Sequence, residues 1–383
     1  MESLKAIIGI LWEIIEGICV LYSFGTIIWL IIPKYWQQNI KGFFRRSLKK
    51  LKIKKDSSIM SSLLLDDIQI VDGPFENYGL RFTIDNTALN VPNDFIIIGE
   101  RLKQENALRE QKGCKPVYTE LYPYAVHTMS IPREQDIIEN IERPVCRITL
   151  RESSYFYSLI AIQAMDEMVG DKTIREKYYQ DILDHPTIPA PNGYDVVHAF
   201  GMNTFVLTKD NSFVFGLRNP DTVATGEGSL HLSVGEHLNK DLLSSGENWK
   251  SNAIKIIIKG LEQELGVEEG KVDSTNIRFY GVALSRKVCQ YGVLGFTHLI
   301  DYTDDDIKKS WEFAAKDGHY ENKEIVFINA TIKSIVKYLN DHKDISMTKF
   351  ALLNVCIALM IEYNISQDEI DRELKKLRPN ALQ

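Results

Sequence analysis

Cysteine is scarce in this chain: its 383 residues include five, namely Cys19, Cys114, Cys146, Cys289 and Cys356. They are odd in number and far apart in the sequence. This spacing fits neither the disulfide framework of a small secreted protein nor a zinc site, which needs closely paired cysteines. A reducing compartment is therefore the expected environment.

Net positive charge is also missing, because the formal net charge is -7 and the isoelectric point is about 5.7. A protein that neutralises many phosphates is usually basic, so general nucleic-acid binding is excluded and DNA is not an expected partner. Internal repeats and long low-complexity runs are absent too, which excludes solenoids and disordered scaffolds. The length allows two domains plus a terminal segment.

One long apolar run is present, at residues 6–33, AIIGILWEIIEGICVLYSFGTIIWLIIP. It has the length that a helix needs to cross roughly 30 Å of hydrocarbon, and one span is expected rather than two. Glu13 and Glu16 interrupt it. A cleaved signal peptide is the alternative, but the sequence lacks a strong basic region before the run and a small-residue cleavage site after it.

A densely basic segment, KGFFRRSLKKLKIKK at 41–55, follows this run. The positive-inside rule then predicts a single-pass protein of a bacterial inner membrane, with the N-terminus outside, the later domains cytoplasmic, and inner-membrane lipids as partners. Glu13 and Glu16 would face partner helices in a homo-oligomer. Alternatively, the helix begins near Gly17 and both carboxylates lie in the interface.

Short apolar stretches and turn residues indicate a small α+β domain over 61–195. Strands are expected in 61–84 and in DFIIIGERL at 94–102, and helices in 132–142 and 154–183. The proline-rich stretch HPTIPAPNGYD, 185–195, is the expected domain boundary. This region shows no constellation of catalytic residues.

A different order of elements follows the boundary. Alternating residues predict a hairpin over 203–219, then a glycine-containing loop and a helix from Asn252 that stops at Gly266. Three further strands are expected in 277–285, 293–303 and 321–330, and a helix in 331–341. Further helices are expected over 342–383.

This order resembles the Nudix fold over Gly201 to Asp341, and KGLEQELGV, Lys259 to Val267, resembles the second half of the Nudix box. The family pattern is G-x5-E-x7-R-E-U-x-E-E-x-G-U, with U aliphatic. The resemblance implies glutamates on one helix face that coordinate Mg²⁺ against a diphosphate. ELGV is also an ordinary helix terminus found in many folds.

The chain departs from the box at positions that carry the chemistry. Lys259 stands for the arginine, Gly260 and Gln263 stand for two glutamates, and only Glu264 stays in register. Glu262 lies one position before the glutamate position of the box that Gln263 occupies, and it is a weaker candidate metal ligand. Glu236, in the loop that begins at Gly235, is a further candidate metal ligand. Magnesium needs hard anionic oxygens, so these losses predict that standard hydrolysis is gone.

A pocket that has lost its metal ligands can still bind a nucleotide through cations and polar side chains. The candidates are Arg218, His231, His237, Lys259 and Arg286. For the two histidines, an ordinary surface or hydrogen-bonded role is the alternative.

The expected fold class is thus mixed α/β, with an N-terminal transmembrane helix and a cytoplasmic Nudix-like mixed sheet between helices, preceded by a smaller α+β domain. The expected segments are an anchor (1–36), a basic linker (37–60), the α+β domain (61–195), the Nudix-like domain (196–341) and C-terminal helices (342–383).

This architecture resembles the transmembrane Nudix effectors of the bacterial anti-phage systems known as CBASS. The resemblance implies an effector that binds a nucleotide second messenger, a cyclic oligonucleotide, and then assembles and disrupts the inner membrane. The alternative is a membrane-tethered, magnesium-dependent hydrolase of a nucleoside diphosphate-linked substrate.

Overall fold

The computed structural model describes residues 68–71, 80–87, 89–111, 122–135, 142–184, 197–220, 228–238, 252–315 and 318–382. All of them belong to one compact unit that spans residues 59–383. The expected anchor and basic linker, with Glu13 and Glu16, lie outside the described residues.

The strands are β1 (Ile68–Val71), β2 (Leu80–Asp85), β3 (Tyr124–Ser130), β4 (Arg133–Gln135), β5 (Glu142–Pro144), β6 (Cys146–Glu152), β7 (Met168–Val169), β8 (Lys172–Thr173), β9 (Gly201–Thr208), β10 (Ser212–Arg218), β11 (Ser229–His231), β12 (Val234–His237), β13 (Ile277–Ser285), β14 (Gln290–Leu299), β15 (Asn322–Asn329) and β16 (Ser346–Met347). The α-helices are α4 (Asn93–Gln111), α5 (Tyr155–Ala164), α6 (Gln180–Asp184), α7 (Asn252–Leu265), α8 (Asp304–Ala314), α9 (Gly318–Glu321), α10 (Ile332–Asp341), α11 (Lys349–Glu362) and α12 (Gln367–Leu374), with a π-helical turn at Arg175–Tyr179 and 3₁₀ turns at Glu269–Lys271 and Ser274–Asn276.

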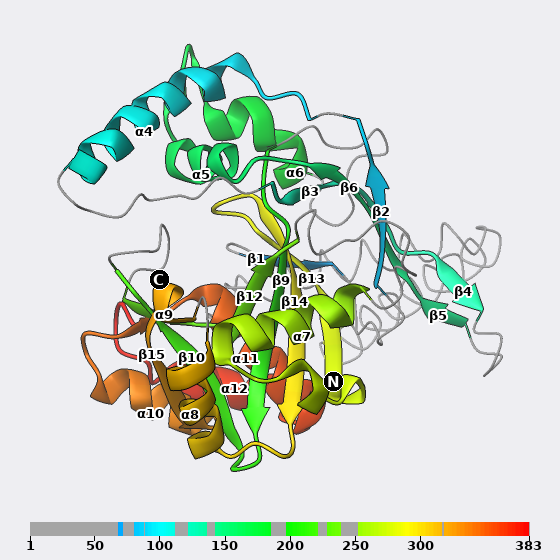
Figure 1. Cartoon of the computed structure of the whole chain (residues 1–383), viewed down its shortest axis with the longest axis vertical. Helices are drawn as coiled ribbons and strands as arrows, with labels where there is room; N and C mark the ends of the chain where they lie inside the picture. The colour runs from blue at the N-terminus through cyan, green and yellow to red at the C-terminus, as the bar shows by residue number, and fades with distance from the viewer. Residues whose placement is uncertain are drawn as a thin grey trace, which may run out of the picture. The chain divides into compact units, whose positions relative to one another are not determined.

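A large mixed sheet forms the centre of the unit, with strand order β1-β13-β14-β9-β10-β11-β16, while β12 also pairs with β9 and β15 with β10 (Figure 1). Strands β14 and β9 run parallel, and β9 and β10 form the antiparallel hairpin expected from the sequence. Asn211 turns that hairpin with a φ of 61°, a conformation that asparagine tolerates better than most residues. The strands expected in 277–285, 293–303 and 321–330 are confirmed as β13, β14 and β15.

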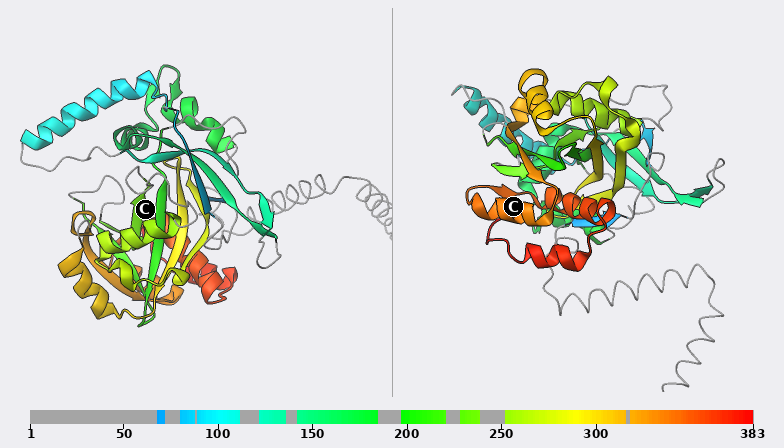
Figure 2. Two further views of the ribbon diagram at one scale, coloured as in Figure 1. Left: turned by 45° about the vertical axis from the view of Figure 1, so that its right-hand side comes forward. Right: turned by 90° about the horizontal axis from the view of Figure 1, so that it is seen from below.

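Helices cover both faces of this sheet (Figure 2). Ile257, Leu261 and Leu265 of α7 bury their side chains in one core, together with Ile307 and Trp311 of α8. A second core on the opposite face collects apolar residues of α10, α11 and α12. The apolar run at 350–360 therefore forms a buried core helix, α11, rather than a surface element.

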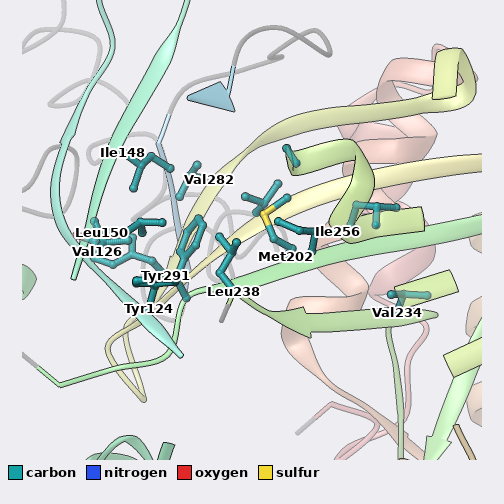
Figure 3. Packing of buried hydrophobic residues seen from close by; sticks show 14 of the residues in the cluster. Tyr124, Val126, Ile148, Leu150, Met202, Val234, Leu238, Ile256, Val282 and Tyr291 are labelled. Carbon is teal, nitrogen blue, oxygen red and sulfur yellow. The ribbon is translucent and has the colours of Figure 1, made fainter. Parts of the chain in front are cut away.

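A smaller sheet, β2-β6-β3, packs against the large one: Val126, Ile148 and Leu150 lie beside residues of the large sheet (Figure 3). Apolar residues of α4 and α5 belong to the same core. Two backbone bonds join them: Tyr124 N–H donates to the Leu238 carbonyl (2.6 Å between N and O), and Phe200 N–H donates to the Tyr124 carbonyl (2.8 Å). Leu238 N–H in turn donates to the Phe200 carbonyl at 3.0 Å, which extends the pairing of β12 with β9. Val126 N–H also donates to Nε2 of the buried His198, at 3.0 Å. The first residues of β9 and the last of β12 are thus fixed against the smaller sheet.

The membrane component of the expected fold class is corrected by the structure. Among the described helices, none combines the length and the apolar character needed to cross a bilayer. The expected single-pass inner-membrane localisation is contradicted by the same finding. The described chain is a mixed α/β structure with several sheets.

Two local predictions in 61–195 were wrong. DFIIIGERL begins the 19-residue helix α4 and is not a strand. Three consecutive isoleucines show neither the helical nor the strand periodicity of apolar residues, so they do not distinguish the two structures. The helix-forming residues that follow them favour the helix. In 132–142, which was expected to be helical, the described ends form the short β4–β5 pair, Arg133–Gln135 with Glu142–Pro144. The helix expected over 154–183 is divided by the β7–β8 pair.

The predicted stop of α7 at Gly266 is confirmed. Gly266 has a φ of +70° and its N–H donates to the Glu262 carbonyl at 3.0 Å, the arrangement of an αL cap. A Cβ at this position would lie 2.2 Å from the Ser310 carbonyl oxygen of α8. The glycine is therefore required both by its conformation and by the close approach of α8.

We expect Gly266→Ala to lower the free energy of unfolding by about 2–4 kcal/mol, because a left-handed alanine and a backbone clash add together. Urea unfolding of the full chain measures this. Gly270→Ala, where an added Cβ meets nothing within 4 Å, is the matched control and should change stability by less than about 1 kcal/mol. Equal losses in the two variants would contradict the packing described for Gly266.

Candidate functional site

Strands β10 and β12 pair with different parts of the same edge of β9, so these two strands diverge at one end of the large sheet. Strand β10 pairs with Val206 and Leu207, whereas β12 pairs with 201–204. Strand β15 pairs with β10 along its whole length, up to Arg218 opposite Asn322, and β11 pairs with the end of β10, with Gly216 opposite His231. The ends of β10, β11 and β12 and the start of β15 thus bring polar side chains near one another.

Glu264 projects from α7 into this region and is buried, with 4% of its surface exposed. Its Oε1 accepts a hydrogen bond from the Gly235 N–H at 2.8 Å. Burial raises the pKa of the Glu264 carboxyl well above its ordinary value, and the charges of Glu321 and Glu236 raise it further. Three carboxyl groups therefore act on one another here, with Arg218 as a cation that offsets part of their charge. We call Glu236, Glu264, Glu321 and Arg218 the acidic cluster.

Glu236 occupies the space that a side chain at position 260 would need. A Cβ added to Gly260 would lie 2.5 Å from Val234 Cγ1, 2.7 Å from Glu236 Cγ and 3.5 Å from Glu236 Oε1. The absence of a side chain at 260 lets α7 approach β12 closely. The carboxylate beside this part of α7 thus comes from a strand, Glu236 of β12, and not from the helix.

Arg218 is the partner of one carboxylate and keeps unused hydrogen-bonding capacity. Its Nη1 lies 3.3 Å from Glu321 Oε2, and 17% of its side chain is exposed against 35% for Glu321. The Arg218 Nε is buried and has no hydrogen-bond partner in the described part of the chain. A buried donor without a partner costs about 1–3 kcal/mol, which a polar ligand can recover.

The two predicted histidines flank the acidic cluster in their neutral form. His231 Nδ1 lies 2.8 Å from Thr348 Oγ1, and His237 Nε2 lies 3.3 Å from Gln290 Nε2, an amide that also donates to the Ala199 carbonyl at 2.8 Å. Burial lowers the pKa of His231 to about 3 and that of His237 to about 4, and the charge of Arg218 adds to both shifts. Each ring is therefore uncharged near pH 7.

Two members of the site were missed by the sequence analysis. Tyr155, the first residue of α5, comes from the smaller sheet's side, and its ring centroid lies 5.4 Å from that of His237. Burial raises the Tyr155 pKa, followed by the charge of Glu321. Glu321 ends α9 directly before β15. Nothing local in the sequence marks either residue, because pairing and packing between distant segments bring them here.

The structure thus brings together Arg218, His231, His237, Glu236 and Glu264. Lys259 is exposed on α7, and Glu262 is half-buried on the same helix. Arg286 lies in the turn between β13 and β14, where its carbonyl accepts a hydrogen bond from Arg175 Nη1 at 2.8 Å.

The described residues do not fit a magnesium site. Within them, no group of three or more His, Cys, Asp or Glu side chains is arranged so that it could hold a metal ion. At the helix itself, Gly260 offers no ligand, Gln263 is neutral, and one Glu264 oxygen is engaged by the Gly235 N–H. Mg²⁺ prefers a near-octahedral set of anionic oxygens and waters, which this donor set does not supply.

Comparison with known proteins gives little guidance. No protein-family model matches the chain, and no curated protein matches it. Among solved structures, a match is the crystal structure of DR0079 from Deinococcus radiodurans, with 14% identity over 38% of this chain and 74% of that chain and a TM-score of 0.26. A likeness this weak carries no inference about fold or function.

The neutral histidines predict a specific pH dependence of stability. The pKa of His237 is about 4 in the folded chain and 6.5 in the unfolded chain. Between pH 4 and pH 6.5 the unfolded chain therefore binds the proton more tightly than the folded chain. Stability should therefore fall as the pH drops below about 6.5, by up to about 1.4 kcal/mol per pH unit for this one ring.

His237→Gln should remove this contribution, so its stability relative to the unmodified chain should improve steadily from pH 6.5 to pH 4.5. Urea unfolding at several pH values measures the difference. His342→Gln, which removes an exposed histidine after α10, is the control. Parallel curves for the unmodified chain and His237→Gln would contradict the burial of a neutral His237.

Proposed function

We propose that residues 201–341 form a Nudix-like module that binds a nucleotide without standard magnesium-dependent hydrolysis. The support is the order of the strands and helices together with the position of α7, whose sequence resembles the box, beside the acidic cluster. The observation that argues most directly for a loss of hydrolysis is the position of Glu236. Its side chain fills the space beside Gly260, where the box has a glutamate.

Metal-dependent hydrolysis of a diphosphate needs ligands that hold the ion and a base or metal-bound hydroxide that supplies the nucleophile. The helix positions that would provide them carry Gly260 and Gln263. The remaining glutamate, Glu264, is buried, and one of its oxygens already accepts a hydrogen bond from the Gly235 N–H at 2.8 Å. Binding is then the function that this region can still perform.

The polar side chains of this region support binding. The Arg218 Nε has no partner within the described chain, and the neutral imidazoles of His231 and His237 lie close by. A nucleotide offers hydroxyls, ring nitrogens and exocyclic groups that can satisfy such donors and acceptors. A cyclic oligonucleotide is the ligand that the resemblance to the anti-phage effectors implies, and it is part of this proposal.

A hydrolase remains the second candidate because of one observation. Glu236, Glu264 and Glu321 lie close enough for their charges to raise the Glu264 pKa, and a bound divalent ion would relieve that repulsion. The two candidates differ in their need for magnesium.

A thermal-shift screen of the full chain separates them. Cyclic di- and trinucleotides are tested in EDTA, and nucleoside diphosphate sugars are tested with magnesium. At 100 times its Kd a ligand stabilises the folded chain by about 2.7 kcal/mol, which is measurable as a rise in Tm. We expect stabilisation by a nucleotide in EDTA and recovery of that nucleotide unchanged. Magnesium-dependent cleavage of a diphosphate sugar would overturn the proposal in favour of the hydrolase.

The packing at Gly260 yields a separate prediction. Alanine usually stabilises a helix interior by about 1 kcal/mol relative to glycine, yet Gly260→Ala should destabilise the chain by about 1–3 kcal/mol because the new Cβ meets Glu236 and Val234. With Glu236→Ala in the same chain, part of this loss should disappear, which gives a coupling energy of at least about 0.5 kcal/mol. Urea unfolding of the two single variants and the double variant measures it. Stabilisation by Gly260→Ala alone would show that Glu236 does not fill this space.

A further inference from the structure

A cavity of about 700 Å³ lies beside Gly266, the glycine that ends α7. Its walls come from the segment after α7, from the loop that follows β14 and from the first turns of α8. No residue of the acidic cluster lines it. A cavity of this size can hold a small organic ligand. Six described residues with charged side chains line it: Glu268, Lys271, Asp273, Asp301, Asp306 and Lys309.

The lining has a formal charge of -2, because four carboxylates outnumber two ammonium groups. One acid is paired directly, since Lys271 Nζ lies 3.2 Å from Glu268 Oε2. The other ammonium group, on Lys309, lies one helical turn after Asp306 on α8. Asp301 is exposed and forms no hydrogen bond or ion pair within the described chain. The unbalanced charge of the cavity is therefore negative.

The two helix ends at the cavity add to this preference. The last carbonyl groups of α7, next to Gly266, carry the partial negative charge of a helix C-terminus. The N-terminal end of α8 would favour an anion, but two of its first N–H groups already have partners. Asp306 N–H donates to Thr303 Oγ1 at 3.2 Å, and Asp304 N–H donates to Asp210 Oδ2 at 2.9 Å. A cation is therefore favoured over an anion.

Tyr302 places an aromatic ring among these carboxylates. It is partly buried and lines the cavity. Burial raises the pKa of Tyr302; the charge of Lys271 opposes this shift, and those of Glu268, Asp306 and Asp301 add to it. These three acids therefore lie close enough to the ring to act on it. The face of a tyrosine ring attracts organic cations, and its hydroxyl oxygen can accept a hydrogen bond from an ammonium group.

The carboxylates border one cavity without converging on one point. Among the described residues, no three His, Cys, Asp or Glu side chains are arranged so that they could hold a metal ion. Mg²⁺ and Ca²⁺ need about six or more oxygen ligands at about 2.0–2.6 Å. A linear organic dication has different needs, since a flexible chain separates its two charges. It can place one ammonium group at each of two separate carboxylates.

We propose that this cavity binds a linear aliphatic diamine or polyamine. One ammonium group lies against Asp301 and the Tyr302 ring, a second lies beside Asp273, and the methylene chain lies against Val272. The site is independent of the proposed nucleotide binding, because it shares no residue with the acidic cluster.

Ligand-observed NMR on the full chain tests the proposal, because this method detects Kd values in the millimolar range. We expect 1,4-diaminobutane to bind in 50 mM NaCl with a Kd of about 0.1–1 mM, and spermidine to bind more tightly, because each exposed ion pair contributes little. Butylamine, with a single charge, should bind at least about 5-fold more weakly than the diamine. Raising NaCl to 500 mM should weaken diamine binding at least about 5-fold, because salt screens exposed charges. MgCl₂ at the same ionic strength should displace the diamine no more than NaCl does.

Two substitutions with opposite expected effects assign the site. Asp301→Asn should weaken the binding of 1,4-diaminobutane at least about 3-fold, and Lys309→Gln, which removes a competing positive charge, should strengthen it at least about 2-fold. A gain in affinity cannot come from a misfolded variant. Asp305→Asn and Lys308→Gln change exposed residues of α8 that do not line the cavity, so each should alter the Kd by less than about 1.5-fold.

The outcomes separate this inference from the proposed function. Equal effects of Asp301→Asn and Asp305→Asn, or diamine binding that does not weaken in 500 mM NaCl, would overturn the diamine site. Full displacement by MgCl₂ at matched ionic strength would overturn it in favour of a metal site. None of these results bears on the proposed function, since the Asp301→Asn variant should bind nucleotides as the unmodified chain does. If diamines bind and nucleotides do not, this site stands and the proposed function fails.

Discussion

The close approach of α7 to β12 is the constraint on which the site depends. It exists because Gly260 has no side chain, so the helix can lie within contact distance of Val234 and Glu236. The same approach lets Glu264, one turn further along α7, accept the Gly235 N–H at 2.8 Å. A side chain at 260 would push the helix away from β12 and break this bond. Gly260, which departs from the box pattern, is therefore also the residue that allows the contact between α7 and β12.

Around this contact, the sheet supplies the remaining groups. The divergence of β10 from β9 places Arg218 beside Glu321, and the short connection from β11 to β12 brings His231 and His237 to the same region. The backbone bonds between Leu238, Phe200 and Tyr124 fix the end of β12 against the smaller sheet, so that Tyr155 can meet His237. Helix α5, which packs with the smaller sheet, therefore contributes a residue to the site.

The sequence predicted the large sheet well because its signals are local. The alternating hairpin over 203–219, the three later strands and the glycine stop at 266 all follow from neighbouring residues. Arg218, His231, His237, Glu236 and Glu264 were chosen as candidates by residue type and position, and the structure brings them near one another. Glu321 and Tyr155 were not, since their roles depend on pairing and packing across long separations. The strand assigned to 94–102 failed because a short apolar run has no distinguishing period. The transmembrane component, which the described helices contradict, had rested on residues outside the described part of the chain.

The central claim is that the acids around α7 bind no catalytic metal, and a titration with Mn²⁺ tests it most directly. Mn²⁺ takes the same oxygen ligands as Mg²⁺, and its free form is counted by electron paramagnetic resonance. With the full chain at about 100 µM and Mn²⁺ added up to 1 mM, the account predicts no saturable binding that Glu264→Gln alters. One bound ion per chain, lost in Glu264→Gln, would contradict it and would make the acidic cluster a metal centre.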